Sequence, residues 1–273
     1  MNLSFGRSTG NQRTTDQKTG IRFHQDFNSG LDGQDRLARL RTRAEGEGRR
    51  GLPDRDHHLG RVADLRAADM DGDGDVDLVV AVFGWTEAGE LLYFENRTAD
   101  FSRPEFRRRK LDRRTGAMRL QLTDLNGDGY LDIYLVNGAT STEPEKVLHN
   151  VLYRNEGDGR AFTDVAAEVG VEVSGVTRQA SFIDYDNDGD LDLFVALRDR
   201  ANRLFRNDGA NDGARFVDVS EASGIDDARR TVGVVWFDMD EDGDLDFFVA
   251  NQNGDADGVF RNDGGHFVDV AAE

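Results

Sequence analysis

The sequence has 273 residues, of which 37% are hydrophobic and none is cysteine. That length supplies enough apolar residues for one large or two small domains, so we expect the chain to fold. The lack of cysteine excludes a disulfide scaffold and any zinc or redox site built on thiolates. No apolar run approaches the ~18 residues of a membrane span, and the polar N-terminus does not read as a signal peptide.

The formal net charge is −19, from 34 basic and 53 acidic side chains. Proteins that bind nucleic acid carry a basic face, so this charge argues against nucleic acid as a partner. The acidic side chains are unevenly distributed. Residues 1–61 hold 12 basic and 8 acidic side chains, whereas residues 62–273 hold 22 and 45. The acidity therefore belongs to the larger, C-terminal part.

Residues 1–60 form a separate N-terminal segment in this interpretation. The stretch IRFHQDF at 21–27 has the pattern of one strand, similar to the last strand of a preceding repeat unit. The arginine-rich stretch at 35–50 is expected to be a solvated linker, with a short helix around Leu37 and Leu40 as the alternative. The pair His57 and His58 is expected to be solvated.

One acidic pattern of nine residues occurs four times after this segment. The copies are DMDGDGDVD (69–77), DLNGDGYLD (124–132), DYDNDGDLD (184–192) and DMDEDGDLD (238–246), with starts 55, 60 and 54 residues apart. An apolar run follows each copy, and later phrases such as LFRNDG (204–209) and FVDV (216–219) also recur. Such self-similarity is the signature of a repeat architecture.

The repeat unit predicts the fold class. Its short runs rich in Val, Phe, Ile and Tyr are bounded by Gly, Asn and Asp, which is typical of strands. One strand before the acidic loop and three after it predict an all-β fold made of β-propeller blades, each with four antiparallel strands. The run after each loop is apolar at consecutive positions, as in a strand buried on both faces. We expect four blades, at about 61–115, 116–176, 177–230 and 231–273, in a partial or open propeller.

The acidic loops are predicted to bind calcium. The four nonapeptides hold 19 acidic side chains, which repel one another unless a cation lies among them. Side-chain oxygens at positions 1, 3, 5 and 9, a glycine at position 6 and a backbone carbonyl at position 7 suit calcium, whereas zinc would need His or Cys. We expect about four calcium ions per chain. The expected ligands, with position 7 acting through its carbonyl, are Asp69, Asp71, Asp73, Asp75, Asp77, Asp124, Asn126, Asp128, Tyr130, Asp132, Asp184, Asp186, Asp188, Asp190, Asp192, Asp238, Asp240, Asp242, Asp244 and Asp246.

Two other interpretations of these loops are weaker. An EF-hand would need a bidentate glutamate at position 12, where the four copies have Val80, Leu135, Val195 and Val249. Asp and Gly can also serve only as turn residues, but four copies with the same positions filled argue against that simpler interpretation. The second loop is expected to bind calcium least tightly, because Asn126 replaces a carboxylate there.

The acidic pattern before an apolar strand, together with FRNDG and FVDV, resembles the FG-GAP/VCBS repeat family, whose blades form the heads of integrin alpha-subunits. The resemblance is stronger still to the bacterial FG-GAP-like proteins related to cartilage acidic protein and the ASPIC/UnbV group. It covers residues 62–273 and implies a calcium-binding propeller that is extracellular, periplasmic or on the cell surface. Nothing in residues 1–60 matches beyond the one strand.

Function is predicted to be binding or adhesion, without catalysis, with a protein or glycan as ligand. The alternative is a calcium-dependent carbohydrate-active enzyme of the polysaccharide-lyase kind, which would need convergent basic or His residues in a cleft near calcium. The basic run Arg107–Lys110 with Arg113 and Arg114 is contiguous and is interpreted as a solvated edge strand. Trp236 is expected in the core and Trp85 on the surface. An open arc would expose two sheet faces and favour self-association.

Overall fold

The computed structural model describes residues 61–84, 89–100, 102–113, 116–138, 149–209, 214–225 and 227–271. All of them belong to one compact unit, residues 58–273. The predicted strand at 21–27, the arginine-rich stretch, His57, His58, Trp85 and Arg114 lie outside the described residues.

The described residues form four antiparallel sheets of four strands. In each sheet, strands that follow one another in the sequence are hydrogen-bonded neighbours. The first sheet contains β1 (Arg61–Ala68), β2 (Asp77–Phe83), β3 (Glu90–Asn96) and β4 (Phe106–Asp112), and the second β5 (Ala117–Thr123), β6 (Asp132–Asn137), β7 (Val151–Asn155) and β8 (Phe162–Asp164). The third contains β9 (Thr177–Ile183), β10 (Asp192–Leu197), β11 (Arg203–Asn207) and β12 (Phe216–Asp218), and the fourth β13 (Thr231–Phe237), β14 (Asp246–Asn251), β15 (Gly258–Asn262) and β16 (Phe267–Asp269). One short helix, α2 (Ala166–Val169), follows β8. This is the predicted all-β fold of propeller blades, and the four sheets do not close into a ring.

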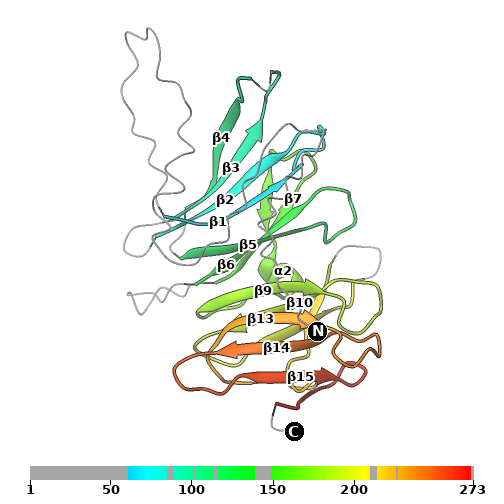
Figure 1. Cartoon of the computed structure of the whole chain (residues 1–273). Coiled ribbons are helices and arrows are strands. Elements are labelled where there is room, and N and C mark those ends of the chain that lie inside the picture. The colour runs from blue at the N-terminus through cyan, green and yellow to red at the C-terminus, as the bar shows by residue number, and fades with distance from the viewer. Residues whose placement is uncertain are drawn as a thin grey trace, which may run out of the picture. The chain divides into compact units, whose positions relative to one another are not determined.

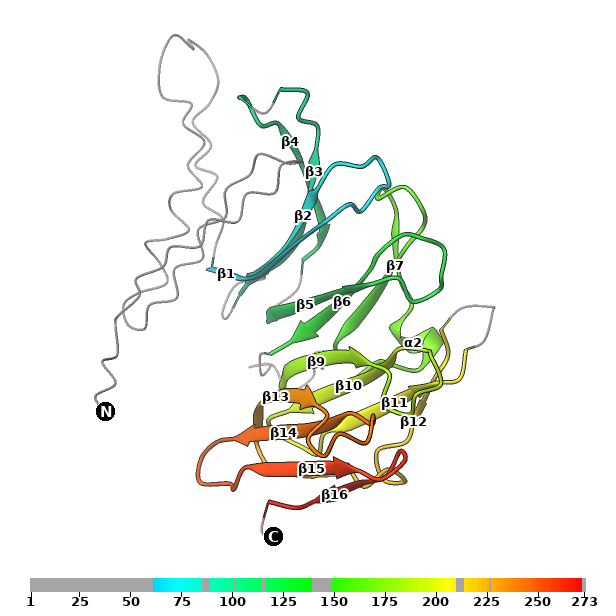
Figure 2. The same cartoon turned by 45° about the vertical axis from the view of Figure 1, so that its right-hand side comes forward.

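The sheets stack face to face in chain order (Figures 1 and 2). Their first strands β1, β5, β9 and β13 are neighbours along the stack. Each of these inner strands carries one extra residue near its start, a β-bulge at Ala63, Met118, Arg178 and Val232. A bulge increases the local twist, so the same device recurs in every sheet. The sequence pattern did not indicate it.

In the second and third sheets the second strand is apolar because it is buried on both faces. In β6, Ile133 and Leu135 pack against the first sheet, whereas Tyr134 and Val136 pack against the third. All four side chains have no exposed surface. Alternate residues thus fill two different cores, which confirms the prediction made from the consecutive apolar run.

Polar side chains of the inner strands fasten each sheet to the next one. Asp64 accepts a hydrogen bond from the Leu120 N–H at 2.9 Å, and Arg66 donates to the Leu120 carbonyl at 3.1 Å. Gln121 donates to the Ala180 carbonyl at 2.8 Å. Gln179 both donates to and accepts from the backbone of Val234, at 2.8 and 3.2 Å. These bonds satisfy backbone groups on the free edge of each following inner strand.

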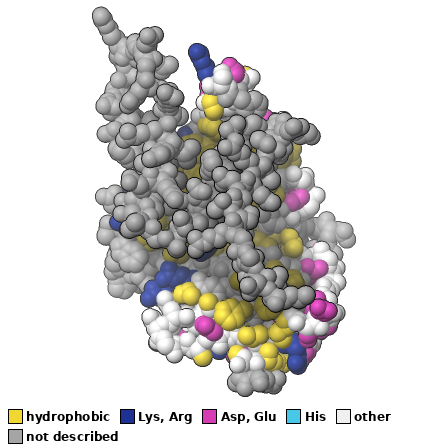
Figure 3. All heavy atoms as spheres, in the orientation of Figure 1, with side chains coloured by type: hydrophobic (Ala, Val, Ile, Leu, Met, Phe, Trp, Pro, Cys, Tyr) yellow, Lys and Arg dark blue, Asp and Glu magenta, His cyan; other side chains and the backbone are white. Residues whose placement is uncertain are grey.

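The outer face of the fourth sheet is exposed and apolar. On the fourth sheet Val235 is 61% exposed and Phe237 39% exposed. Hydrophobic side chains gather in Figure 3 where Figure 1 shows β13, β14 and β15. The fourth sheet therefore presents one exposed apolar face of the kind that an open arc predicts.

Candidate metal centres

The four acidic loops join the first and second strands of each sheet, and all lie at the same edge of the stack (Figure 1). The aspartate at position 1 organises each loop from within. Its Oδ2 accepts the N–H of the position 6 glycine in every copy, at 2.9 Å in the first and second loops, 3.1 Å in the third and 3.2 Å in the fourth. A carboxylate at position 1 therefore has a role in the turn as well as in any metal site.

Positions 4 and 6 of each loop have left-handed backbone. The glycine at position 6 has φ between 89° and 96°, as the sequence led us to expect for a sharp turn. The sequence pattern did not indicate the left-handed backbone at position 4. There φ is 60° at Asn187 and 62° at Glu241, where the first two loops have glycine. A side chain with a Cβ is strained there, so Glu241 costs the fold about 1–2 kcal/mol.

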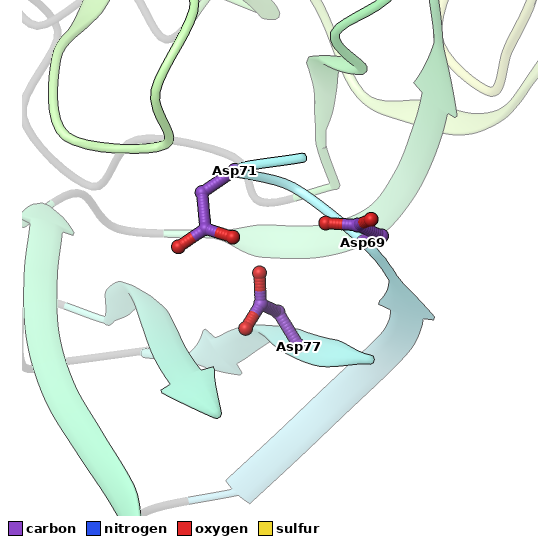
Figure 4. A group of neighbouring side chains, drawn as sticks. All are labelled: Asp69, Asp71 and Asp77. Carbon is purple, nitrogen blue, oxygen red and sulfur yellow. The ribbon is translucent and has the colours of Figure 1, made fainter. Parts of the chain in front are cut away.

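Carboxylates from positions 1, 3 and 9 converge in three of the loops. The groups are Asp69, Asp71 and Asp77; Asp184, Asp186 and Asp192; and Asp238, Asp240 and Asp246, each with carboxylate oxygens within 4.8 Å of one another. Figure 4 shows the first group, with the side chains turned toward a common point. Each group combines two residues of the loop with the first residue of the following strand, so the hairpin itself assembles it.

The aspartate at position 9 is buried and hydrogen-bonded to the protein. Asp77, 1% exposed, accepts from the Asn96 N–H through Oδ1 and from the Met70 N–H and Tyr93 hydroxyl through Oδ2. The first two of these bonds recur in all four sheets. Position 9 thus anchors its loop to the third strand. Any cation that it binds must share oxygens that already accept these bonds.

The third loop holds two carboxylate oxygens that no protein group satisfies. Asp184 Oδ1 and Asp186 Oδ1 are buried and have no hydrogen-bond partner. Burial, followed by the charges of Asp188 and Asp184, raises the pKa of Asp186. A buried oxygen without a partner is costly, and a cation is the group that would satisfy two of them at once.

Burial also raises the pKa of three of the aspartates at position 9, which anchor the loops. It raises the pKa of Asp192 to about 7 and that of Asp132 to about 6, although backbone N–H donors at both sites oppose the shift. In the first loop burial raises the pKa of Asp77, and burial with the charges of Asp77 and Asp73 raises that of Asp71. The loops therefore hold carboxylates that are disfavoured as anions when no cation compensates them.

The second loop is different, although all of its residues are described. No group of three carboxylates forms there within the same distance. Asn126 donates through Nδ2 to Asp128 Oδ2 at 2.9 Å and accepts the Asp128 N–H at 3.2 Å. The amide of Asn126 thus compensates part of the negative charge of Asp128, whereas the other loops would need a cation for this.

Positions 5 and 7 lie outside the converging groups. The position 5 aspartates Asp73, Asp128, Asp188 and Asp242 each accept the N–H of position 7, at 2.8–2.9 Å. At position 7 the ring of Tyr130 packs over Gly72 of the first loop, where an added Cβ would lie 3.1 Å from it. Asp244 accepts from Asn187 of the third loop at 2.7 Å. The position 7 side chains therefore connect neighbouring loops in two of the three junctions.

Sequence reasoning missed the asparagine that ends the third strand of each sheet. These third-strand asparagines are Asn96, Asn155, Asn207 and Asn262, and each donates through Nδ2 to the carbonyl of position 8 in its own loop, at 3.1–3.3 Å. The signal was present, because an asparagine ends the corresponding phrase in every unit, namely FEN, YRN, FRN and FRN. Its role becomes visible only when strands and loops are placed together.

The other candidate residues do not form a catalytic constellation among the described residues. Arg109 of the basic strand β4 lies over the Tyr93 ring and donates to carbonyls of Gly159 and Arg160 in the second sheet. It therefore joins two sheets and is not simply solvated. Arg108 and Lys110 pair with Glu90.

Trp236 packs in the core against Phe194 and Phe247, as predicted.

A cavity of about 240 Å³ lies between the second and third sheets, beside the second acidic loop. Its lining is mixed, with Leu125, Leu152 and Val169 among the apolar side chains and Asp132, Arg154 and Glu168 among the charged ones. Arg154 is paired with Glu156 at 3.1 Å. The convergent basic cleft that a lyase would require is not found around this cavity.

Fold and loops together define a class of protein, namely an all-β repeat chain in which an acidic loop joins the first two strands of every four-stranded sheet. The family described as FG-GAP-like repeat matches residues 69–135, 124–195 and 184–249. The chain belongs to this family.

Curated relatives carry the name cartilage acidic protein 1. The proteins from Xenopus tropicalis and Homo sapiens are each 28% identical to this chain over 207 residues, and that from Mus musculus is 26% identical over the same length. The match covers 71% of this chain and 31–32% of the relatives, so the chain spans about a third of their length. Within the described residues no helix is both long and apolar enough to cross a membrane.

Proposed function

We propose that the acidic loops bind calcium, about four ions per chain, through the side chains of positions 1, 3, 5 and 9 and the carbonyl of position 7. The observation that carries the proposal is the pair of buried, unpartnered oxygens of Asp184 and Asp186 within a converging group. An all-oxygen donor set suits a hard cation with flexible coordination. Calcium would neutralise the loop and join its turn to the strand that follows.

The test is a direct count of bound ions. Equilibrium dialysis at millimolar calcium should give about four ions per chain, with the second loop the last to fill. Magnesium is the matched competitor, because it demands a tighter octahedral site than these loops offer. A stoichiometry below three would contradict the assignment.

The calcium-ordered stack is proposed to act as a binding or adhesion module whose ligand is a protein or a glycan. Membership of the FG-GAP-like family supports an interaction role, and no observation on the described residues favours the lyase alternative. Binding to an array of glycans and extracellular-matrix proteins, measured with calcium and with chelator, tests the module. Turnover of a polysaccharide in the same samples would contradict a non-catalytic role.

An extracellular, periplasmic or cell-surface location is proposed from the family and from the relatives. Sites that work outside the cell need dissociation constants of only about 10⁻⁴–10⁻³ M, because calcium is abundant there. Fractionation of the source cells with an antibody to this chain tests the location. A purely cytosolic signal would refute it.

The exposed face of the fourth sheet is proposed to mediate self-association. Val235 and Phe237 leave apolar surface exposed on this face. On the third sheet, by contrast, the Gln179 side chain bonds to the backbone of the next sheet. Sedimentation of the wild type and of Val235→Lys at several concentrations tests this. Association that is weakened by the substitution supports the proposal, and a wild type that stays monomeric contradicts it.

A further inference from the structure

The acidic loops are connected to one another through the third-strand asparagines. In every sheet this asparagine donates its backbone N–H to the position 9 carboxylate, at 2.7–2.8 Å, and its side-chain amide to the position 8 carbonyl of the same loop. Each asparagine is therefore part of the framework that holds its own loop.

Two of these asparagines reach a second loop as well. Asn155 Nδ2 donates to the Met70 carbonyl at 2.8 Å, and Asn262 Nδ2 donates to the Tyr185 carbonyl at 2.8 Å. Both side chains are fully buried. Met70 and Tyr185 occupy position 2 of the first and third loops, between two members of a converging group. One buried amide thus holds the framework of two loops in neighbouring sheets.

The residue whose carbonyl receives this bond is itself tied to the carboxylates. The Met70 N–H donates to Asp77 and the Tyr185 N–H donates to Asp192, both at 3.1 Å. In the third and fourth loops a second bond, from Asn187 to Asp244 at 2.7 Å, runs in parallel. Through Met70 and Tyr185, hydrogen bonds therefore lead from the position 9 aspartate of one loop to that of the next loop.

The junction between the second and third sheets lacks this connection. Among the described residues the Asn207 amide donates only to Leu191 of its own loop, and its Oδ1 accepts from Gly209 and Arg215. The position 2 residue of the second loop, Leu125, instead lines the cavity of about 240 Å³. The loops are thus connected as first with second and third with fourth.

We infer that the loops bind calcium in two coupled pairs, and that Asn155 and Asn262 are the positioning residues that couple them. The inference rests on the proposed calcium sites. A cation in one loop fixes the position 2 peptide, and the buried amide then holds the partner loop in its binding geometry. Coupling of this kind is reciprocal and has a typical size of about 5–150-fold in affinity. Between the second and third loops we expect none.

The experiment reads each loop separately. The position 6 glycine N–H groups of Gly74, Gly129, Gly189 and Gly243 give one NMR signal for each loop, and a calcium titration of the full chain then yields four affinities. Asp186→Ala disables the third loop. The affinity of the fourth loop should then fall at least about fivefold, whereas that of the second loop should change less than about twofold.

Asn262→Ala and Asn207→Ala form a matched pair of variants. Both remove a buried amide that holds its own loop, but only the first removes a bond between sheets. In Asn262→Ala only the bond from Asn187 to Asp244 remains between the two loops, so the effect of Asp186→Ala on the fourth loop should shrink. In Asn207→Ala it should persist in full. If Asn262→Ala fails to fold, Asn155→Ala with Asp71→Ala gives the same comparison between the first and second loops.

The outcomes separate the inference from the function on which it rests. Glycine signals that do not respond to calcium would overturn the calcium sites themselves. Signals that respond while Asp186→Ala affects neither neighbour, or affects the second and fourth loops equally, would overturn the pairing alone. Loss of coupling in Asn207→Ala as well as in Asn262→Ala would show that the asparagine bond between sheets is not the connection.

Discussion

The second and third acidic loops occupy the same place in their sheets but balance their charge differently. In the second loop the Asn126 amide donates to Asp128 and leaves three carboxylates. In the third loop Asp186 stands in the same position, with a buried oxygen that has no partner. Burial raises the pKa of Asp192 in the third loop to about 7, compared with about 6 for Asp132 in the second.

This difference shows that one backbone geometry can be stabilised in two ways. An internal amide makes the second loop partly self-sufficient, whereas the third loop keeps carboxylate oxygens that only an external cation can satisfy. A loop with more unsatisfied charge gains more from the ion and loses more without it. The third loop should therefore depend on calcium more strongly than the second.

Removal of calcium should have the largest effect. A site occupied at 100 times its dissociation constant adds about 2.7 kcal/mol to the free energy of unfolding, so four sites occupied to that extent add about 11. Chelation should lower the melting temperature and increase hydrogen exchange more at 184–192 than at 124–132. An unchanged melting temperature would mean that the acidic loops are only turns.

Substitutions within the third loop should separate ligands from bystanders. Asp188→Ala removes a proposed ligand at position 5 and should cost up to about 2.7 kcal/mol in calcium, the whole contribution of one site. Asp190→Ala keeps the position 7 carbonyl and should cost less than about 0.5 kcal/mol. The equivalent Asp128→Ala in the second loop should cost less than Asp188→Ala. Melting temperatures in calcium and in chelator provide the measurement, and equal damage from Asp188→Ala and Asp190→Ala would refute the ligand assignment.

The pH dependence of the metal-free protein should follow the anchoring aspartates. Burial raises the pKa of Asp192 in the folded protein from 3.8 to about 7. The protonated carboxyl group therefore contributes fully to the free energy of unfolding below pH 3.8, and this contribution is lost as the pH rises to about 7. For Asp132 the loss ends at about 6. Melting temperatures in metal-free buffer should therefore fall between pH 4 and 7, and Asp192→Asn should flatten the curve above pH 6. With calcium bound the trend should reverse, because the ion requires the ionised carboxylate.

Asn126→Asp should make the second loop resemble the third. The added carboxylate should increase calcium affinity at that loop about tenfold, which corresponds to about 1.4 kcal/mol. In chelator the same change should destabilise the fold by about 1 kcal/mol, because a hydrogen bond becomes a repulsion. Titration of the Gly129 signal measures the first effect and thermal unfolding the second. A rise in stability without calcium would contradict this account of the second loop.

Glu241→Gly should have the smallest effect and should stabilise the fold. Glu241 has φ of 62°, where the first two loops have glycine. Relief of this strain should add about 1 kcal/mol to the free energy of unfolding, partly offset by the greater freedom of glycine in the unfolded chain. Glu241→Ala is the control, because it removes the charge but keeps the strain. If both variants gain equally, the benefit comes from the charge and not from the backbone.

Local pattern in the sequence was enough for the fold class and for the composition of the loops. A strand buried on both faces must be apolar at consecutive positions, as in residues 133–136, and a left-handed turn requires glycine at position 6. Both constraints act within a few residues, so they leave a signal that repeats four times. The recurring asparagine of the third strand left the same kind of signal, but no local rule connects it with a loop 15–23 residues away.

Only the tertiary structure decided which groups meet between sheets. Asn155 and Met70 are 85 residues apart, and Asn262 and Tyr185 are 77 apart, yet Asn207 makes no such bond among the described residues. The three asparagines stand in equivalent places in their repeats. Whether one reaches the preceding loop depends on the packing of two sheets, and the position 2 residue that Asn207 does not reach, Leu125, lines a cavity. Packing distances between sheets are set by many side chains at once, so they cannot be inferred from any one repeat.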